Sequence, residues 1–161
     1  MNFTNPNKYE SRNLNFKDLI ADKLTRQHFM KLMGFELTKI EAGYIEGEAV
    51  LDQKLQQQDG MVHGGVTSTV ADIVTGFAAF SLVDKDDRVV TSNLNVSYYA
   101  PGKGERIFAR GWVSKPGARV HYCEGEVYVI RNGEPHLIAK VNSIMAVIQG
   151  KNKQVEDSIT N

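Results

Sequence analysis

The sequence predicts a single α+β domain in which one antiparallel sheet wraps around a long central helix. Three observations indicate this fold class. The chain has 161 residues, the size of one domain. Its apolar residues recur at helical spacing before Gly34 and alternate as in strands after it. The resulting order of short helices, two strands, one long helix and four strands suits a sheet that covers one central helix.

Residues 1–33 are expected to form an arm and one or two short helices. The first dozen residues are rich in Asn and predict an arm that is either loose or docked on the domain. From residue 16 to residue 33, apolar side chains recur at helical spacing. Asn15 is suited to cap the start of this helical segment, and Gly34 is suited to end it.

Residues 34–149 contain the predicted sheet and central helix, and turn signals such as Asn132-Gly133 separate the strands. The expected elements are two strands within 35–51 that meet near 41–43, a polar loop at 52–60, the central helix at 65–83, a charged loop at 84–87, and strands at 88–100, 105–114, 119–131 and 135–148. Residues 150–161 are polar and predict a frayed tail.

The composition excludes several classes of protein. Lys and Arg total 19 and Asp and Glu total 19, so the chain lacks the basic excess of a nucleic-acid binder. The single cysteine, Cys123, cannot form an internal disulfide and is expected to pack as a small apolar residue. No apolar run is long enough for a membrane span or a signal peptide. We therefore expect a soluble cytoplasmic protein with no nucleic-acid or membrane partner.

The predicted central helix has two distinct faces. The first is broad and apolar, and the sheet should bury it; it consists of Val66, Val70, Ile73, Phe77 and Phe80. The second is a stripe of small residues with one carboxylate, consisting of Gly65, Ser68, Thr69, Asp72, Gly76 and Ala79. Residues 66–83 contain no Lys or Arg to pair with Asp72. Asp72 is therefore either a solvent-exposed residue or a functional carboxylate in a partly buried site.

The triplet His63-Gly64-Gly65 stands where a loop enters this helix. The first backbone N–H groups of a helix have no internal partners, and two glycines allow a ligand to approach them closely. Such a helix end can hold a phosphate or polarise a carbonyl whose oxygen becomes an oxyanion. The alternative is that the glycines only permit a sharp turn.

Three segments carry a family resemblance: VHGGVTSTVADIVTGFAA, VVTSNLNVSYYAPGKGERIFARGWV and VYVIRNGEPHLIAKVNSIMAVI. Together they resemble the hotdog-fold acyl-CoA thioesterases of the PaaI type, and the likeness covers about residues 34–148. The resemblance implies a hotdog fold, subunits that pair through their sheets, and dimers that often pair again as tetramers. It implies no cofactor, because CoA is part of the substrate.

The resemblance also implies roles for individual residues. Asp72 matches the helix carboxylate that acts as general base or nucleophile, and the Gly64 N–H matches the donor to the thioester oxygen, with His63 and Gly65 beside it. Thr91 matches a hydroxyl that helps to place the water. Gln57 stands where the family tends to have Asn. The flanking Gln56 and Gln58 are alternatives to Gln57 as the residue that faces the site.

Helix geometry adds a constraint on these roles. Eight residues separate Gly64 from Asp72, which is about 12 Å of helical rise. One thioester cannot contact both groups on the same helix. Two antiparallel helices across a two-fold axis would bring the start of each near the middle of the other. We therefore expect a homodimer with two composite sites as the active unit, and an inactive monomer.

The remaining candidates are weaker. Lys115 and Arg119 lie near strand turns and either bind the phosphates of CoA or belong to a solvated turn. The four histidines show no metal-binding spacing, so no metal is expected. The acyl group is open between aryl-acetyl and medium-chain types. Two rival functions are an acyl-thioester dehydratase or hydratase of the same fold and a non-catalytic acyl-CoA-binding protein.

Overall fold

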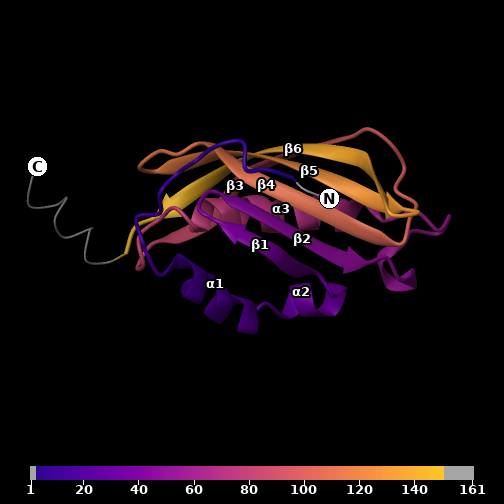
Figure 1. Cartoon of the computed structure of the whole chain (residues 1–161), viewed down its shortest axis with the longest axis horizontal. Coiled ribbons are helices and arrows are strands. Elements are labelled where there is room, and N and C mark those ends of the chain that lie inside the picture. The colour runs from indigo at the N-terminus through magenta and orange to yellow at the C-terminus, as the bar shows by residue number, and fades with distance from the viewer. Residues whose placement is uncertain (1–2, 151–161) are drawn as a thin grey trace, which may run out of the picture.

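The computed structural model describes residues 3–150 and shows a curved antiparallel sheet around one long helix (Figure 1). Six strands form the sheet in the order β1-β2-β4-β5-β6-β3. The elements are α1 (Phe16–Thr25), α2 (His28–Met33), β1 (Glu36–Glu41), β2 (Tyr44–Val50), a short 3-10 helix (Gln53–Leu55), α3 (Gly64–Phe80), β3 (Arg88–Tyr98), β4 (Arg106–Lys115), β5 (Val120–Arg131) and β6 (Glu134–Ile148). This arrangement is the hotdog fold, so the predicted α+β class is confirmed.

The predicted elements are all present, with shifted ends. The central helix ends at Phe80 rather than at residue 83, because Leu82 and Val83 donate to carbonyls three residues back and continue the chain as a tight turn. β3 ends at Tyr98 rather than at residue 100. Pro101, which has no N–H to donate to the sheet, follows three residues later. The loop predicted at 52–60 contains the short 3-10 helix Gln53–Leu55. The predicted tail lies outside the described residues except for Gly150.

The helix α3 packs against the sheet at two paired glycines. Gly111 of β4 pairs with Gly125 of β5. A Cβ atom at position 111 would lie 2.7 Å from the carbonyl carbon of Val74, and one at position 125 would lie 3.2 Å from the Thr75 methyl group. Because these two positions lack side chains, the backbone of α3 approaches the sheet directly.

The buried face of α3 matches the predicted face only in part, since Val70, Phe77 and Phe80 are buried as predicted and the other two residues are not. The fully or nearly fully buried residues toward the sheet include Thr67, Val70, Ala71, Val74, Thr75 and Ala78. Val66 and Ile73 are only half-buried, and Ala79, predicted on the small-residue stripe, is completely buried. The prediction chose the face of the helix with the most apolar side chains. In the structure, the helix backbone lies close to Gly111 and Gly125, and only small or β-branched side chains fit at that contact.

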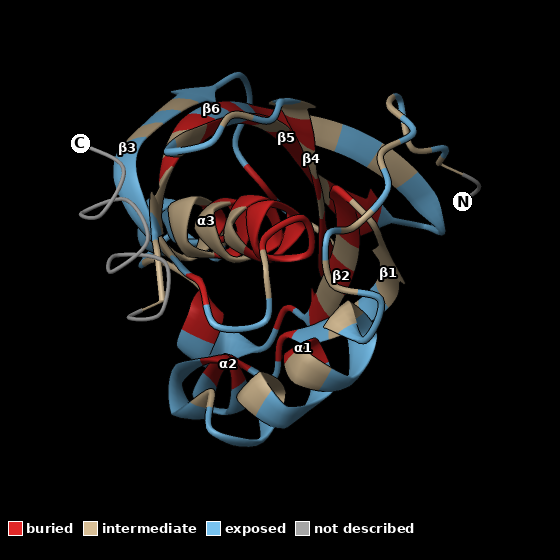
Figure 2. Ribbon diagram, turned by 90° about the vertical axis from the view of Figure 1, so that its left-hand side faces the viewer, coloured by how far each residue is buried: buried red, intermediate tan, exposed pale blue. Residues whose placement is uncertain are grey.

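The short helices α1 and α2 close the open side of the curved sheet (Figure 2). Ile20 from α1 and Met30 and Met33 from α2 enter the core. Gly34 ends α2 in the left-handed conformation, as predicted. Asn15 stands at the start of α1, but its side chain makes no capping hydrogen bond. No helix among residues 3–150 has the length and apolar character needed to cross a bilayer.

The N-terminal arm is docked rather than loose. It runs along the outside of the sheet, where Asn7 Nδ2 donates to the Val113 carbonyl (3.0 Å) and the Tyr9 hydroxyl donates to the Ser114 carbonyl (2.9 Å). The Phe3 ring stacks on Phe108, with 5.4 Å between the ring centroids. Of the two alternatives for this segment, the docked arm is confirmed.

Candidate functional site

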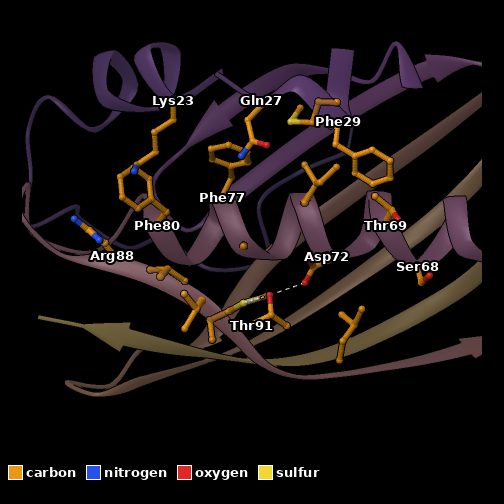
Figure 3. A pocket seen from close by; sticks show the side chains of 17 residues that line it. Lys23, Gln27, Phe29, Ser68, Thr69, Asp72, Phe77, Phe80, Arg88 and Thr91 are labelled. Carbon is orange, nitrogen blue, oxygen red and sulfur yellow. Dashed lines mark hydrogen bonds between the residues drawn. The ribbon is translucent and has the colours of Figure 1, made fainter. Parts of the chain in front are cut away.

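Asp72 and Thr91 face each other in a pocket of about 690 Å³ beside α3 (Figure 3). The Thr91 hydroxyl donates a 2.7 Å hydrogen bond to Asp72 Oδ1. Asp72 is half-buried, so it is neither a freely exposed surface residue nor sealed in the core. Within residues 3–150 no Lys or Arg forms an ion pair with it. The hydroxyl of Thr91 therefore orients this carboxylate.

A β-bulge at Ser92 aims Thr91 at the helix. Thr91 pairs with Met145 and Asn93 pairs with Ile144, so Ser92 has no partner of its own in the ladder. Before the bulge, Val89 and Thr91 point inward, whereas after it the inward positions are Leu94 and Val96. A strictly alternating strand could not place residues 91 and 94 on the same side of the sheet.

Side chains of both predicted helix faces line this pocket. From the small-residue stripe come Ser68, Thr69 and Gly76, and from the apolar face come Ile73, Phe77 and Phe80. The α1–α2 segment supplies a further wall with Lys23, Gln27, Phe29 and Met30, none of which the sequence singled out as functional. Only helical spacing marked this segment, and helical spacing does not tell which core residues border a cavity.

The start of α3 has the geometry of a helix end with one free donor. His63 is the N-cap, and its Nδ1 accepts the Gly65 N–H at 2.9 Å. Among residues 3–150 the Gly64 N–H has no acceptor. The Tyr98 hydroxyl donates to the Gly64 carbonyl at 2.9 Å. Gly65 is thus engaged by the cap, while the Gly64 N–H is available to a ligand.

Gly64 lines a second pocket of about 410 Å³, together with Gln57, Thr67 and Tyr98. Of the three adjacent glutamines, only Gln57 borders this pocket. The Gln56 side chain donates to the Leu51 carbonyl, and the exposed Gln58 donates to Asp59. Gln57 Oε1 accepts the Asp59 N–H at 3.1 Å, which fixes the loop around it. No sequence signal marks Tyr98 as a partner of Gly64, because β3 and the start of α3 meet only in the folded protein.

The two pockets are separate within one chain. Asp72 and Thr91 line the first, Gly64 and Gln57 line the second, and no residue lines both. Gly64 and Asp72 both lie on α3, separated by about 12 Å of helical rise. A single chain therefore does not bring the free N–H and the carboxylate to one point.

Three other candidates lie outside both pockets. Lys115 and Arg119 are exposed at the turn between β4 and β5 and line neither pocket. Cys123 is buried, and burial raises the pKa of its thiol to about 12. A thiol that stays protonated in the core is a packing residue, as the sequence predicts, and not a nucleophile.

The curved sheet around one helix, with a hydrogen-bonded carboxylate and a glycine-rich helix start, defines the class of hotdog-fold proteins. Residues 59–135 match the family model described as the thioesterase superfamily. A thioesterase family protein from Silicibacter pomeroyi with a known crystal structure is 32% identical to this chain. That match covers 84% of this chain and 99% of the other, with a TM-score of 0.82. The chain belongs to the thioesterase superfamily, and its class of activity is thioester hydrolysis.

Two further proteins are similar to this chain at lower sequence identity. The proofreading thioesterase EntH of Klebsiella pneumoniae is 29% identical over 75 residues, which are 47% of this chain and 55% of EntH. The matched region thus spans about half the length of EntH. The PaaI protein from the phenylacetic acid degradation operon of E. coli has a TM-score of 0.76 at 16% identity, over 87% of this chain and 98% of PaaI. This last likeness supports the fold.

Proposed function

We propose that this protein is an acyl-CoA thioesterase that converts an acyl-CoA and water to a free acid and CoA. The observation that carries the proposal is the Asp72 carboxylate, held by Thr91 at 2.7 Å in a pocket whose walls are mostly apolar. A positioned carboxylate beside space for an acyl group can activate water next to a thioester. The acyl group itself is an aryl-acetyl or a medium-chain one.

In the proposed reaction, Asp72 takes a proton from a water molecule while the water oxygen attacks the thioester carbonyl carbon. The electron pair of the carbonyl bond moves to oxygen, and the Gly64 N–H stabilises this oxyanion. The C–S bond then breaks, and the CoA thiolate leaves and receives the proton. Direct attack by Asp72 would instead form an anhydride that water hydrolyses. His63 supports either route, because its cap on Gly65 fixes the first turn of α3.

The proposed site is shared between two subunits. Asp72 and Thr91 come from one chain, and Gly64 and Gln57 of the partner subunit complete the site, because one chain holds these pairs in separate pockets. The strand β3 offers a surface for pairing, since it is a long edge strand with exposed Val90 and Tyr98. A two-fold axis beside β3 would create two such sites per dimer.

Release of thiol from a panel of acyl-CoA esters tests the activity. We expect Asp72→Asn to lower kcat/KM by at least about 10² while leaving substrate binding largely intact. Equal rates for the variant and the wild type would contradict the proposal. Conversion of an acyl-CoA without release of thiol would indicate a dehydratase or hydratase, and binding without any conversion would indicate an acyl-CoA binder.

A subunit-mixing experiment tests the shared site. Gly64 is the first residue of α3, a position that proline favours in helices. The residue before a proline must be extended, and His63 is extended, with φ −65° and ψ 137°. Gly64→Pro should therefore remove the N–H without disturbing the helix. Each of Gly64→Pro and Asp72→Asn should be inactive alone.

Mixed dimers of these two variants should contain one intact site. Random exchange makes about half of the dimers mixed, so about a quarter of the wild-type activity should return. A matched mixture of Asp72→Asn with Thr91→Val should recover less activity, because both changes damage the half of the site that comes from the same subunit. No recovery in the first mixture, with exchange verified by mass spectrometry, would contradict the shared site.

A further inference from the structure

Two cationic side chains lie at one end of the Asp72 pocket. Lys23 comes from α1 and Arg88 from the first position of β3, and both line the pocket beside Phe80 (Figure 3). The Lys23 ammonium lies 4.6 Å from the centroid of the Phe80 ring. The ring therefore helps to hold this ammonium at the pocket end. The Gln27 side chain adds an amide to the same wall.

Neither cation is neutralised by a carboxylate of the described part of the chain. Within residues 3–150, no carboxylate lies within ion-pair distance of Lys23 or Arg88. By contrast, Arg110 binds Glu126 and Arg106 binds Glu48. Two positive charges near each other repel, and an anion placed between them would relieve that repulsion.

The wall between the carboxylate and the cations is apolar. Ile73, Phe77 and Phe80 lie along it on α3, and Gly76 leaves it open, since a Cβ atom at that position would meet nothing within 4 Å. The eight residues from Asp72 to Phe80 span about 12 Å. An extended chain advances about 3.5 Å over three bonds, so an acyl group of about eight to ten carbons, with a hydrogen bond of about 3 Å from its far end, would reach from Asp72 to the cations.

We propose that the acyl group of the substrate carries a carboxylate at its far end, which Lys23 and Arg88 bind. This inference rests on the proposed thioesterase function, because it places the thioester carbon at Asp72. The phosphates of CoA are another source of negative charge. However, the pantetheine arm would have to bury its two amides along Ile73, Phe77 and Phe80, which offer them no hydrogen-bond partner, and Gln27 is the one amide that faces this wall among the lining residues. An apolar chain with a terminal carboxylate fits that wall.

Hydrolysis of a matched pair of thioesters tests the proposal. We expect wild-type kcat/KM to be higher for suberyl-CoA, which has a terminal carboxylate, than for octanoyl-CoA of the same length. Lys23→Met and Arg88→Gln should each lower the suberyl-CoA value about 10- to 100-fold and leave the octanoyl-CoA value within about threefold. Lys23→Arg should retain most of the preference. The control Lys17→Met, an exposed lysine of α1 outside the pocket, should change neither substrate.

Suberyl and octanoyl thioesters of pantetheine, which lack the nucleotide of CoA, show which anion the cations bind. If Lys23→Met still affects only the suberyl compound, the anion belongs to the acyl group. If both CoA esters are affected equally and neither pantetheine thioester is, the cations bind CoA and the proposal is wrong. Equal wild-type rates for the two CoA esters, with Asp72→Asn inactive on both, would overturn the inference but not the thioesterase function.

Calorimetry with non-hydrolysable thioether analogues of the two CoA esters gives a readout that needs no turnover. Tighter binding of the suberyl analogue, lost in Lys23→Met, supports the inference even if no thioester in the panel is hydrolysed. Equal binding of both analogues by wild type and variant overturns it.

Discussion

Thr91 is the residue on which the orientation of the Asp72 carboxylate depends. Its hydroxyl is 2.7 Å from Asp72 Oδ1 and also lies 3.5 Å from the Met145 sulfur, so packing and hydrogen bonding fix the same rotamer. In the proposed reaction, a carboxylate with a fixed orientation directs one oxygen toward the water that it activates. The hydroxyl thus contributes to the positioning of the carboxylate.

Replacement of Thr91 by Val should separate positioning from binding. We expect kcat to fall about 10- to 100-fold with KM nearly unchanged, since a hydrogen bond to a charged group contributes about 1.5–3 kcal/mol. Thr91→Ser keeps the hydroxyl and should recover most of the activity. Steady-state kinetics of both variants provide the measurement, and an unchanged kcat in Thr91→Val would show that Asp72 does not need this partner.

His121 is a buried titratable residue that lines neither pocket, although it pairs across the sheet with Met145, which borders the Asp72 pocket. Its side chain is 2% exposed, and its Nδ1 has no partner within residues 3–150. Burial, assisted by the positive charge of Arg12, lowers the pKa of His121 below its ordinary value of 6.5. The folded protein therefore takes up this proton at lower pH than the unfolded chain does.

The stability of the protein should consequently decrease as the pH falls below about 6.5. In that range the unfolded state binds the proton and the folded state does not, so His121 lowers the free energy of unfolding by up to about 1.4 kcal/mol per pH unit until the folded pKa is reached. Urea unfolding of the wild type and His121→Leu at pH 7.5 and 5.5 measures the difference. The exposed His136, changed to Gln, is the control and should leave the pH dependence intact.

At the scale of elements, the contact between α3 and the sheet depends on two glycines that face each other across β4 and β5. A Cβ atom at Gly111 would lie 2.7 Å from the Val74 carbonyl carbon and 2.8 Å from the Thr75 nitrogen. Both atoms belong to the helix backbone, so no side-chain rotation can make room. The helix that carries Asp72 and Gly64 is therefore positioned by backbone contact.

Gly111→Ala should destabilise the protein by about 1–3 kcal/mol, because the helix must move away from the sheet. Gly76→Ala is the matched control on the opposite side of the helix. It adds a Cβ atom where nothing lies within 4 Å and should stabilise the helix by about 0.5–1 kcal/mol. Chemical denaturation of the two variants should show opposite signs, and equal stability of Gly111→Ala and the wild type would refute this account of the packing.

At the scale of the whole molecule, the N-terminal segment covers both sides of the domain. The arm before α1 lies on the outer face of the sheet, while α1 and α2 close the inner side and border the Asp72 pocket (Figures 1 and 2). On the outer face, the Arg110 guanidinium lies 4.1 Å from the centroid of the Phe3 ring and binds Glu126. The segment is therefore part of the fold as well as a wall of the pocket.

Removal of residues 1–13 should lower the thermal stability of the protein. Loss of the Phe3 ring contacts and of the Asn7 and Tyr9 hydrogen bonds should decrease the free energy of unfolding by about 2 kcal/mol. For a chain of this size that corresponds to a decrease in Tm of about 4–8 °C. A thermal melt measures the shift. Thr4→Ala, at an exposed position of the arm, is the control, and an unchanged Tm after the deletion would mean that the docked arm contributes nothing.

The sequence alone determined the order of elements, the helix start at His63-Gly64-Gly65 and the position of Asp72 on α3, because each depends on local features. Apolar periodicity, glycine and proline turns, and helix-start chemistry act within a few residues along the chain. The eight-residue separation of Gly64 and Asp72 also follows from helix geometry alone. That separation is what makes a site shared between subunits the expected arrangement.

Only the tertiary structure decided which face of α3 meets the sheet, where Thr91 points and what surrounds the Asp72 pocket. The first depends on Gly111 and Gly125 coming together from different strands, and the second on a bulge that shifts the inward positions of β3. The pocket wall joins α1 and α3, which are far apart in the sequence. Such contacts form between residues that local propensity does not connect, so no pattern within one segment reveals them.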